Sequence, residues 1–239
     1  MTDKVIDTNM VTIVGKIASD KEFSHEMYGE GFYSFDLEVP RLSNHVDILP
    51  VTISERLLVD VNLKLGEYLV VEGQLRSYNR YVNGNNRLVL TIFARETYIP
   101  KDEEELNEIL KRPNEIYLDG YICKEPVYRT TPFGREITDL LIAVNRPYNK
   151  SDYIPCIAWG RNARFCEKLE VGDHIKLWGR IQSREYQKKL TDGEVLNKVA
   201  FEVSVSKLEY LKDDNNREGK EFDDYKENSE DEEVQGVVI

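Results

Sequence analysis

Three histidines and three cysteines are the residues of this 239-residue chain best suited to nucleophilic or metal chemistry. His25, His45 and His174 lack the spacing of a zinc-binding helix, and the cysteines form no CxxC pair. The sequence also contains no GxSxG turn and no phosphate-binding glycine loop. We therefore expect no catalytic site, no metal and no cofactor. The odd number of cysteines argues for a reducing, cytoplasmic setting.

A second set of residues is suited to binding rather than to catalysis. Single-stranded nucleic acid is bound by flat side chains that stack on bases, at about 1–3 kcal/mol per base, and by cations along the phosphate path. The candidate stacking residues are Tyr148, Tyr153, Trp159 and Tyr186, and the candidate phosphate ligands are Arg146, Lys150, Arg161, Arg180, Arg184, Lys188 and Lys189. Because side chains alternate along a strand, we expect some of these aromatic residues to belong to the core.

The elements that must position these residues occur twice. The sequence matches itself at a spacing of 105 to 106 residues, which indicates two copies of one domain. The first matches place Asn9, Gly15, Ile17, Val39 and Arg41 on Asn114, Gly120, Ile122, Val144 and Arg146. Later matches place Gly66, Gly73, Leu75 and Ser77 on Gly172, Gly179, Ile181 and Ser183.

Each copy shows the apolar alternation of short strands. Strands are predicted over 11–18, 33–39, 48–53, 68–75 and 88–94, and again over 115–123, 136–144, 153–159, 174–182 and 198–205. One helix is predicted between the third and fourth strand of each copy, over 54–65 and 161–169. Five strands with a helix in this position is the order of an OB-fold, a small Greek-key barrel. The sequence therefore predicts a mainly β chain with two tandem OB-fold barrels.

Net charge divides the chain into four regions. The whole chain has 44 acidic and 32 basic residues, a formal charge of −12, which taken alone argues against nucleic acid as a partner. The first copy, residues 1–100, carries −4, and the linker, residues 101–113, carries −2 and is expected to form a short helix. The second copy, residues 114–212, carries +2, whereas the tail, residues 213–239, carries −8. Most of the negative charge therefore lies outside the barrels.

The tail has few large apolar residues and no periodicity, so we expect it to be disordered. Its last acidic residues include Glu232 and Glu233, and its tip consists of the apolar residues Val237, Val238 and Ile239. An acidic segment with an apolar tip is suited to an apolar pocket ringed by Lys and Arg on a partner protein. The alternative is a tail that only keeps the chain soluble.

The segment from Arg146 to Tyr186 resembles the signature region of bacterial single-stranded DNA-binding proteins. In that family an aromatic-bearing loop precedes a strand that ends in an aromatic residue and glycine, and a later strand reads Gly-Arg-Ile/Leu-Gln-Ser/Thr-Arg-aromatic. The residues that fit are Ala163, Gly172, Gly179, Arg180, Ile181, Gln182, Ser183, Arg184 and Tyr186. The resemblance maps the family's stacking aromatics onto Tyr148, Tyr153, Trp159 and Tyr186. It covers residues 114–211 and, through the repeat, extends more weakly over 9–99.

This resemblance implies a non-enzymatic protein that binds single-stranded DNA without strong sequence preference and protects it during replication, recombination or repair. The acidic tail resembles the family's tail, which implies recruitment of replication or repair proteins, although its tip lacks the usual Ile-Pro-Phe end. Tandem-barrel members reach four barrels by dimerising, so a homodimer is implied. A cytoplasmic, nucleoid-associated protein of bacterial or phage origin is also implied, and no apolar run is long enough to suggest a membrane span.

The first copy departs from this pattern. It carries Ser43, Ile48, Ser54 and Arg80 where the second copy carries aromatic residues. Its candidate secondary contacts to DNA are Arg76, Tyr78, Arg80 and Arg87, and we expect this copy to contribute mainly fold, dimerisation or path geometry. Two other functions stay open: a protein-interaction OB module of a replication assembly, and binding of single-stranded RNA, which uses the same stacking.

Overall fold

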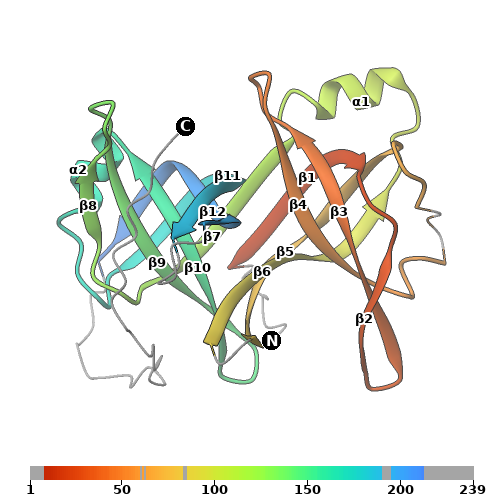
Figure 1. Cartoon of the computed structure of the whole chain (residues 1–239), viewed down its shortest axis with the longest axis horizontal. Coiled ribbons are helices and arrows are strands. Elements are labelled where there is room, and N and C mark those ends of the chain that lie inside the picture. Colours follow the sequence, from red (N-terminus) through yellow and green to blue (C-terminus); the bar gives the residue numbers. More distant parts are fainter. Residues whose placement is uncertain (1–7, 60, 62, 83–84, 190–194, 213–239) are drawn as a thin grey trace.

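The computed structural model describes residues 8–59, 61, 63–82, 85–189 and 195–212. Figure 1 shows two β-barrels next to each other, the first copy on the right and the second on the left. The acidic tail lies outside the described residues, and the prediction that it is disordered falls on this part of the chain. The predicted docking residues also lie there: Glu232, Glu233, Val237, Val238 and Ile239. Within the described part of the chain, no helix is long and apolar enough to cross a membrane.

The first barrel consists of five strands and one added edge strand. Its strands are β1 (Asn9–Ile17), β2 (Glu22–Met27), β3 (Glu30–Pro40), β4 (Val46–Ser54), β5 (Tyr68–Val82) and β6 (Asn85–Tyr98). Antiparallel pairs join β1 to β3, β3 to β4, β5 to β6 and β1 to β5, and a parallel pair between β4 and β6 closes the barrel. Strand β2 extends the sheet beyond β3.

The second barrel repeats this arrangement. Its elements are β7 (Asn114–Ile122), β8 (Val127–Thr130), β9 (Glu136–Arg146), β10 (Lys150–Trp159), α2 (Arg161–Cys166), β11 (His174–Lys189) and β12 (Val195–Leu211). The pairs β7–β9, β9–β10, β11–β12 and β7–β11 are antiparallel, and the closing pair β10–β12 is again parallel. The prediction of a mainly β chain with two tandem OB-fold barrels is confirmed.

Alternation of apolar and polar residues accounts for most of these strands. In β7, for example, Ile116, Leu118 and Ile122 are at most 2% exposed, while the side chains of Tyr117, Asp119 and Tyr121 are partly exposed. Each barrel encloses such inward-facing residues from its five main strands, β1 and β3–β6 in the first copy and β7 and β9–β12 in the second. Strands β2 and β8 were not predicted, because all six residues of β2 are exposed and β8 is only four residues long. These two strands therefore lack the apolar pattern on which the prediction depended.

A glycine at equivalent positions lets each barrel bend. β5 and β11 each contain an irregularity, between Glu72 and Gly73 and between Trp178 and Gly179. A Cβ added at Gly73 would run into the backbone carbonyl of Phe93, and one added at Gly179 would run into that of Ser204. Neighbouring backbone therefore approaches too closely for any side chain at these bulges.

Two of the three helices predicted between strands are present in the structure, at least in part. The linker contains α1 (Glu103–Ile109), whose N-terminus is capped by the Asp102 side chain accepting the Glu105 N–H at 2.8 Å. The helix expected over 161–169 is present in part as α2. The helix expected over 54–65 is wrong for the described residues, which form turns after β4. The run Val59-Asp60-Val61-Asn62 consists of poor helix formers, which accounts for the difference.

The two barrels are joined by an antiparallel pair between β1 and β7, which makes one twelve-stranded sheet. Val11 pairs with Ile116, and these residues are equivalent in the internal repeat. On either side, Asn9 pairs with Leu118 and Ile13 pairs with Asn114. Each of these pairs is mapped onto the other by the repeat, so a local two-fold axis passes through the Val11–Ile116 pair.

Candidate nucleic-acid interface

The hairpin between β9 and β10 carries the most exposed aromatic residue of the second copy. Tyr148 is 95% exposed in the short loop that follows Arg146 and precedes its pairing partner Lys150. Tyr148 and Asn149 both have positive φ, 63° and 54°, a conformation that costs about 1–2 kcal/mol for a residue with a Cβ. The Tyr148 ring contributes little to the barrel core and is presented to solvent by a defined backbone geometry.

Two further candidates lie on one outer face of β10. Tyr153 and Trp159 are six residues apart, so alternation places them on the same side, whereas Asp152 and Cys156 lie on the opposite side at no more than 3% exposure. The indole N–H of Trp159 donates to the Ser204 hydroxyl on β12 at 3.1 Å. Neither aromatic residue belongs to the buried core, contrary to our expectation for part of this set.

Tyr186 lies on the long arm that β11 and β12 form beyond the barrel. The Arg184 guanidinium lies 5.8 Å from the Tyr186 ring centroid, and its Nε lies 3.6 Å from Glu202. Along β11, Tyr186 is six residues after Arg180. Arg180 pairs with Ser204 of β12, whose hydroxyl accepts the Trp159 indole N–H. At about 3.3 Å per residue the separation of Tyr186 from Arg180 corresponds to about 20 Å. The aromatic candidates therefore mark an extended path, as a strand of nucleic acid requires, rather than a single pocket.

Of the candidate phosphate ligands whose side chains are described, Lys150, Arg161 and Arg184 are exposed. Lys150 begins β10 next to the Tyr148 loop, and Arg161 begins α2 just after Trp159. Lys188 and Lys189 belong to β11, but their side chains lie outside the described part. Lys150 and Arg161 thus lie near the two ends of β10, and Arg184 lies on β11 next to the Tyr186 ring.

Arg146 and Arg180 are placed differently, because each lies next to a buried carboxylate. Arg146 Nη2 is 2.6 Å from Asp152 Oδ1, and Arg180 Nη1 is 3.7 Å from Asp47 Oδ2. Burial lowers the pKa of Arg180, and the positive charge of Arg41 lowers it further. Because an arginine pKa starts far above neutrality, Arg180 stays charged. Phosphate contact by these two arginines stays a prediction, and it competes with ion pairs that are already formed.

The first-copy candidates lie on the β5–β6 arm. Tyr78 is 49% exposed, and Arg80 pairs across the arm with Arg87, so two exposed cations face each other. Arg76 instead lies 2.9 Å from Asp152 of the second copy. Burial lowers the pKa of Arg76, and its hydrogen bond to Asp152 partly offsets this effect.

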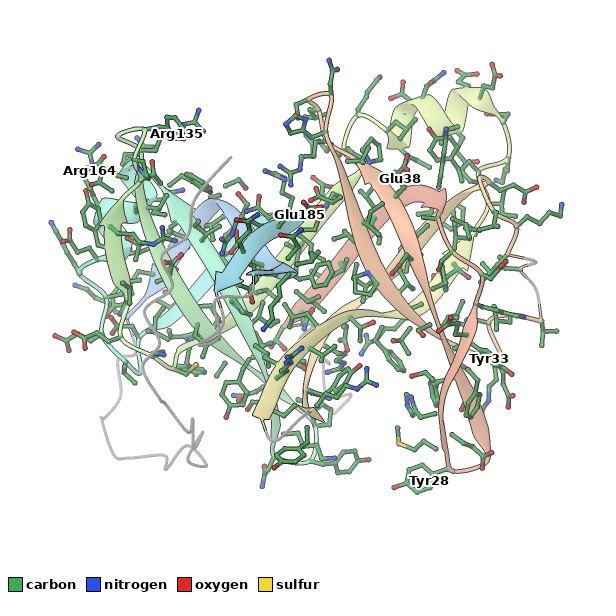
Figure 2. The ribbon with its side chains drawn as sticks, viewed as in Figure 1. Tyr28, Tyr33, Glu38, Arg135, Arg164 and Glu185 are labelled. Atoms are coloured by element: carbon green, nitrogen blue, oxygen red, sulfur yellow. The ribbon has the colours of Figure 1, made fainter. Side chains whose placement is uncertain are left out.

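The structure also shows exposed aromatic residues that the sequence analysis did not select. Phe133 is 75% exposed in the turn before β9, and Figure 2 shows its neighbour Arg135 at the same end of the barrel as Arg164. Tyr28 is fully exposed, with φ 54°, at the tip of the long β2–β3 hairpin on the right of Figure 2. The signals that could have revealed these positions are the Pro132-Phe133-Gly134 and Tyr28-Gly29 turns.

Titratable residues do not gather into a metal site in the described ranges of the chain. His174 Nε2 lies 2.6 Å from Asp119 Oδ1, and the His174 ring stacks on Tyr121 at 4.4 Å. Tyr117 O–H donates to the other Asp119 oxygen at 3.3 Å, and burial, followed by the Asp119 charge, raises the pKa of Tyr117 to about 12. These groups bind one another on the outer face of the sheet.

The second copy is similar in sequence to a known protein family. Residues 113–211 match the model of the single-strand binding protein family. Single-stranded DNA-binding protein 1 of Staphylococcus aureus is 30% identical over 125 residues, which cover 47% of this chain and 72% of that protein. The chain belongs to the single-strand binding protein family. Single-stranded DNA-binding protein 2 of Listeria innocua is 29% identical over 119 residues and is covered to the same extent.

Solved structures extend the similarity to both barrels. The wild-type single-stranded DNA-binding protein of Thermus aquaticus superimposes with a TM-score of 0.68, covering 88% of this chain and 96% of that one at 18% identity. At this identity the likeness shows the fold alone. The tandem arrangement of barrels is therefore found in a single-strand binding protein of known structure, while sequence similarity to the family concentrates in the second copy.

Proposed function

We propose that this chain binds single-stranded DNA without strong sequence preference, by stacking bases on the second copy and pairing phosphates with its exposed cations. The observation that carries the proposal is Tyr148, an aromatic ring 95% exposed at a hairpin tip and continued along β10 by Tyr153 and Trp159. Aromatic faces accept every base, so such a path is tolerant of sequence. Membership of the single-strand binding protein family supports the same ligand.

The proposed mechanism is passive. A bound strand follows the path from the Tyr148 hairpin along β10 to the β11–β12 arm, where it is kept open and shielded during replication, recombination or repair. Counterion release should weaken binding with rising salt, with a slope of about 0.7 for each phosphate contact. A homodimer would bring four barrels together, and the tail, whose charge of −8 is separate from the slightly basic second copy, would recruit other replication or repair proteins.

The test is a fluorescence titration that uses the two tryptophans of the chain, Trp159 and Trp178, as reporters. We expect quenching by oligo-dT, weaker quenching by poly-U, and none by duplex DNA, at two salt concentrations. Stronger binding of poly-U than of oligo-dT would favour RNA as the ligand. An absence of quenching by any single strand, with no binding by filter retention, would refute nucleic-acid binding and leave the protein-interaction module.

Two tyrosine variants make the test specific to the second copy. Loss of one stacked base, about 1–3 kcal/mol, corresponds to a 5- to 150-fold weaker affinity for oligo-dT in Tyr148→Ala. Tyr28→Ala is a matched control, because Tyr28 is also an exposed hairpin-tip tyrosine with positive φ but lies in the acidic first copy. Its affinity should stay within twofold of the wild type. An equal loss in both variants would contradict the assignment to the second copy.

A further inference from the structure

Two aspartates at the seam between the barrels are completely buried. Asp47 on β4 and Asp152 on β10 each have 0% exposure, and the internal repeat makes them equivalent. A buried carboxylate is tolerated only when hydrogen-bond donors and cations surround it. In both cases part of these donors comes from the other copy, so each aspartate connects the two barrels.

Asp152 is held by a group of contacts that we call the first clamp, formed with Arg76 and Ser77 of the first copy. The Ser77 N–H donates to Asp152 Oδ1 at 2.6 Å, and Arg76 Nη1 donates to Oδ2 at 2.9 Å. The neighbouring Tyr153 N–H donates to the Ser77 hydroxyl at 2.7 Å. Arg146 completes the clamp, with Nη2 at 2.6 Å from Asp152 and at 3.1 Å from the Ser77 carbonyl oxygen, to which it donates.

Asp47 is held in the same way by a second clamp. Arg41 Nε and Nη2 donate to its two oxygens at 2.8 and 2.7 Å, and the Ser183 N–H donates to Oδ1 at 2.7 Å. Arg41 Nη2 also donates to the Ser183 carbonyl oxygen at 3.2 Å. Figure 2 shows Glu185, two residues further along β11, at this seam between the barrels.

The clamps differ in one informative respect. In the first clamp, the arginine that reaches the aspartate from the other copy is Arg76 of β5. In the second clamp it is Arg180 of β11, two residues before the position that the repeat makes equivalent to Arg76. The repeat aligns Arg76 with Gln182 and Arg180 with Gln74, so arginine and glutamine have exchanged places on one face of the strand. A cation near the buried carboxylate is present in both clamps although its position in the strand is not the same. This indicates that the arginine is positioned by its ion pair with the aspartate rather than by a fixed position along a nucleic-acid path.

The first clamp lies on the strand that presents the stacking residues. Asp152 is four residues after Tyr148, and Tyr153 is itself the partner of Ser77. Figure 1 shows the β9–β10 hairpin crossing the lower end of the β5–β6 arm at the place these contacts describe. The strained loop at Tyr148 and Asn149 is thus anchored by a residue that receives its hydrogen bonds from the other copy.

We infer that Arg76 and Ser77 of the first copy are positioning residues for single-strand binding by the second copy, acting on the Tyr148 hairpin through Asp152. This inference rests on the proposed function. It assigns Arg76 a role that does not require contact with phosphate. The first copy thereby affects affinity for DNA, although it has no aromatic residues at the positions equivalent to the stacking residues of the second copy.

The test is a double-mutant cycle on oligo-dT affinity with the full-length chain, using Arg76→Ala, Tyr148→Ala and the combined variant. We expect Arg76→Ala to weaken binding at least fivefold, and the combined variant to bind no more than twofold more weakly than Tyr148→Ala alone. Multiplicative losses, with the combined variant weakened by the product of both single effects, would overturn the inference. If wild-type protein does not bind oligo-dT, the proposed function fails first and the inference fails with it.

The dependence of affinity on salt separates positioning from phosphate contact. Arg76→Ala should leave the slope of log affinity against log salt unchanged, whereas loss of a phosphate ligand would reduce its magnitude by about 0.7. Arg56→Ala is the matched control for loss of one positive charge from the first copy, because Arg56 is 78% exposed and pairs with Glu30 at 3.1 Å rather than with either clamp aspartate. Its oligo-dT affinity should stay within twofold of the wild type.

A second variant covers the case in which Arg76→Ala does not fold. Ser77→Ala removes only the hydroxyl that accepts the Tyr153 N–H, and keeps the backbone N–H to Asp152. We expect a two- to fivefold loss of oligo-dT affinity that disappears when Tyr148 is also replaced by alanine. An undiminished loss in that background would overturn the inference.

Discussion

Replacement of Asp47 by asparagine tests the buried ion pair of the second clamp in isolation from the stacking residues. The Asp47 carboxylate is 1% exposed and receives hydrogen bonds from Arg41 at 2.7 and 2.8 Å and from the Ser183 N–H and hydroxyl at 2.7 and 3.1 Å. Removing one partner of a buried pair costs about 3–5 kcal/mol. We take the lower end, about 3 kcal/mol, because the Arg41 side chain is 24% exposed and regains some hydration.

The assay is urea unfolding of the Asp47→Asn variant and the wild type, followed by circular dichroism at pH 7. A thermal melt provides a second measurement. At about 2–4 °C per kcal/mol for a chain of this size, the same loss of stability lowers the melting temperature by about 6–12 °C. Asp139→Asn is the matched control, because Arg129 also forms a two-point pair with Asp139, at 2.8 and 3.3 Å, but both side chains are more than 40% exposed. The control should lose no more than about 1 kcal/mol.

The difference in unfolding free energy between the wild type and Asp47→Asn should change with pH in a definite direction. Burial tends to raise the pKa of Asp47, but the hydrogen bonds from Arg41 and Ser183 outweigh it, and the pKa is lowered overall. The resulting stabilisation is present above the ordinary aspartate pKa of about 3.9 and is lost as pH falls through the lower, folded-state pKa. The gap between wild type and Asp47→Asn should therefore close below pH 4. A loss no larger than that of Asp139→Asn, or a gap that persists in acid, would refute the reasoning.

Two further predictions concern the bulges and the tail. Gly73→Ala and Gly179→Ala should each destabilise the fold by about 1–3 kcal/mol in urea unfolding, because the new Cβ meets a backbone carbonyl that cannot rotate away; unchanged unfolding midpoints would show that the neighbouring strand yields freely. Deletion of residues 213–239, which removes a charge of −8, should strengthen oligo-dT binding at low salt and have no effect at high salt. An unchanged affinity at low salt would show that the tail does not compete with DNA.

The repeat and the periodicity of apolar residues predicted most of the fold. Strands such as β7 bury every second side chain, and that pattern is local in sequence. β2 lacks it, because a strand with six exposed residues is held by its pairing with β3 and not by burial of its own side chains. The helix expected over 54–65 rested on its place between two strands, and the composition Val59 to Asn62 did not support it.

Candidate site residues could be selected from the sequence by type, but their partners could not. Alternation led us to expect part of the aromatic set in the core, whereas Tyr153 and Trp159 share the outer face of β10. The ion pairs of Arg76 and Arg146 depend on Asp152, which is 76 residues from Arg76 in the chain and comes close only through the joined barrels. A positively charged residue between aromatic residues therefore has two possible partners, a phosphate or a carboxylate of the other copy, and only the fold distinguishes them.

The local two-fold axis at the Val11–Ile116 pair has a consequence for how the two halves can change. In a symmetric dimer of identical chains, a substitution in one half appears in the other half as well. Here the halves are covalently joined, and the β1–β7 pairing covers an edge that either barrel alone would expose to aggregation. The same pairing geometry can therefore be kept while one half becomes acidic and the other basic. Joining the copies frees each surface to specialise without loss of the contact that holds them together.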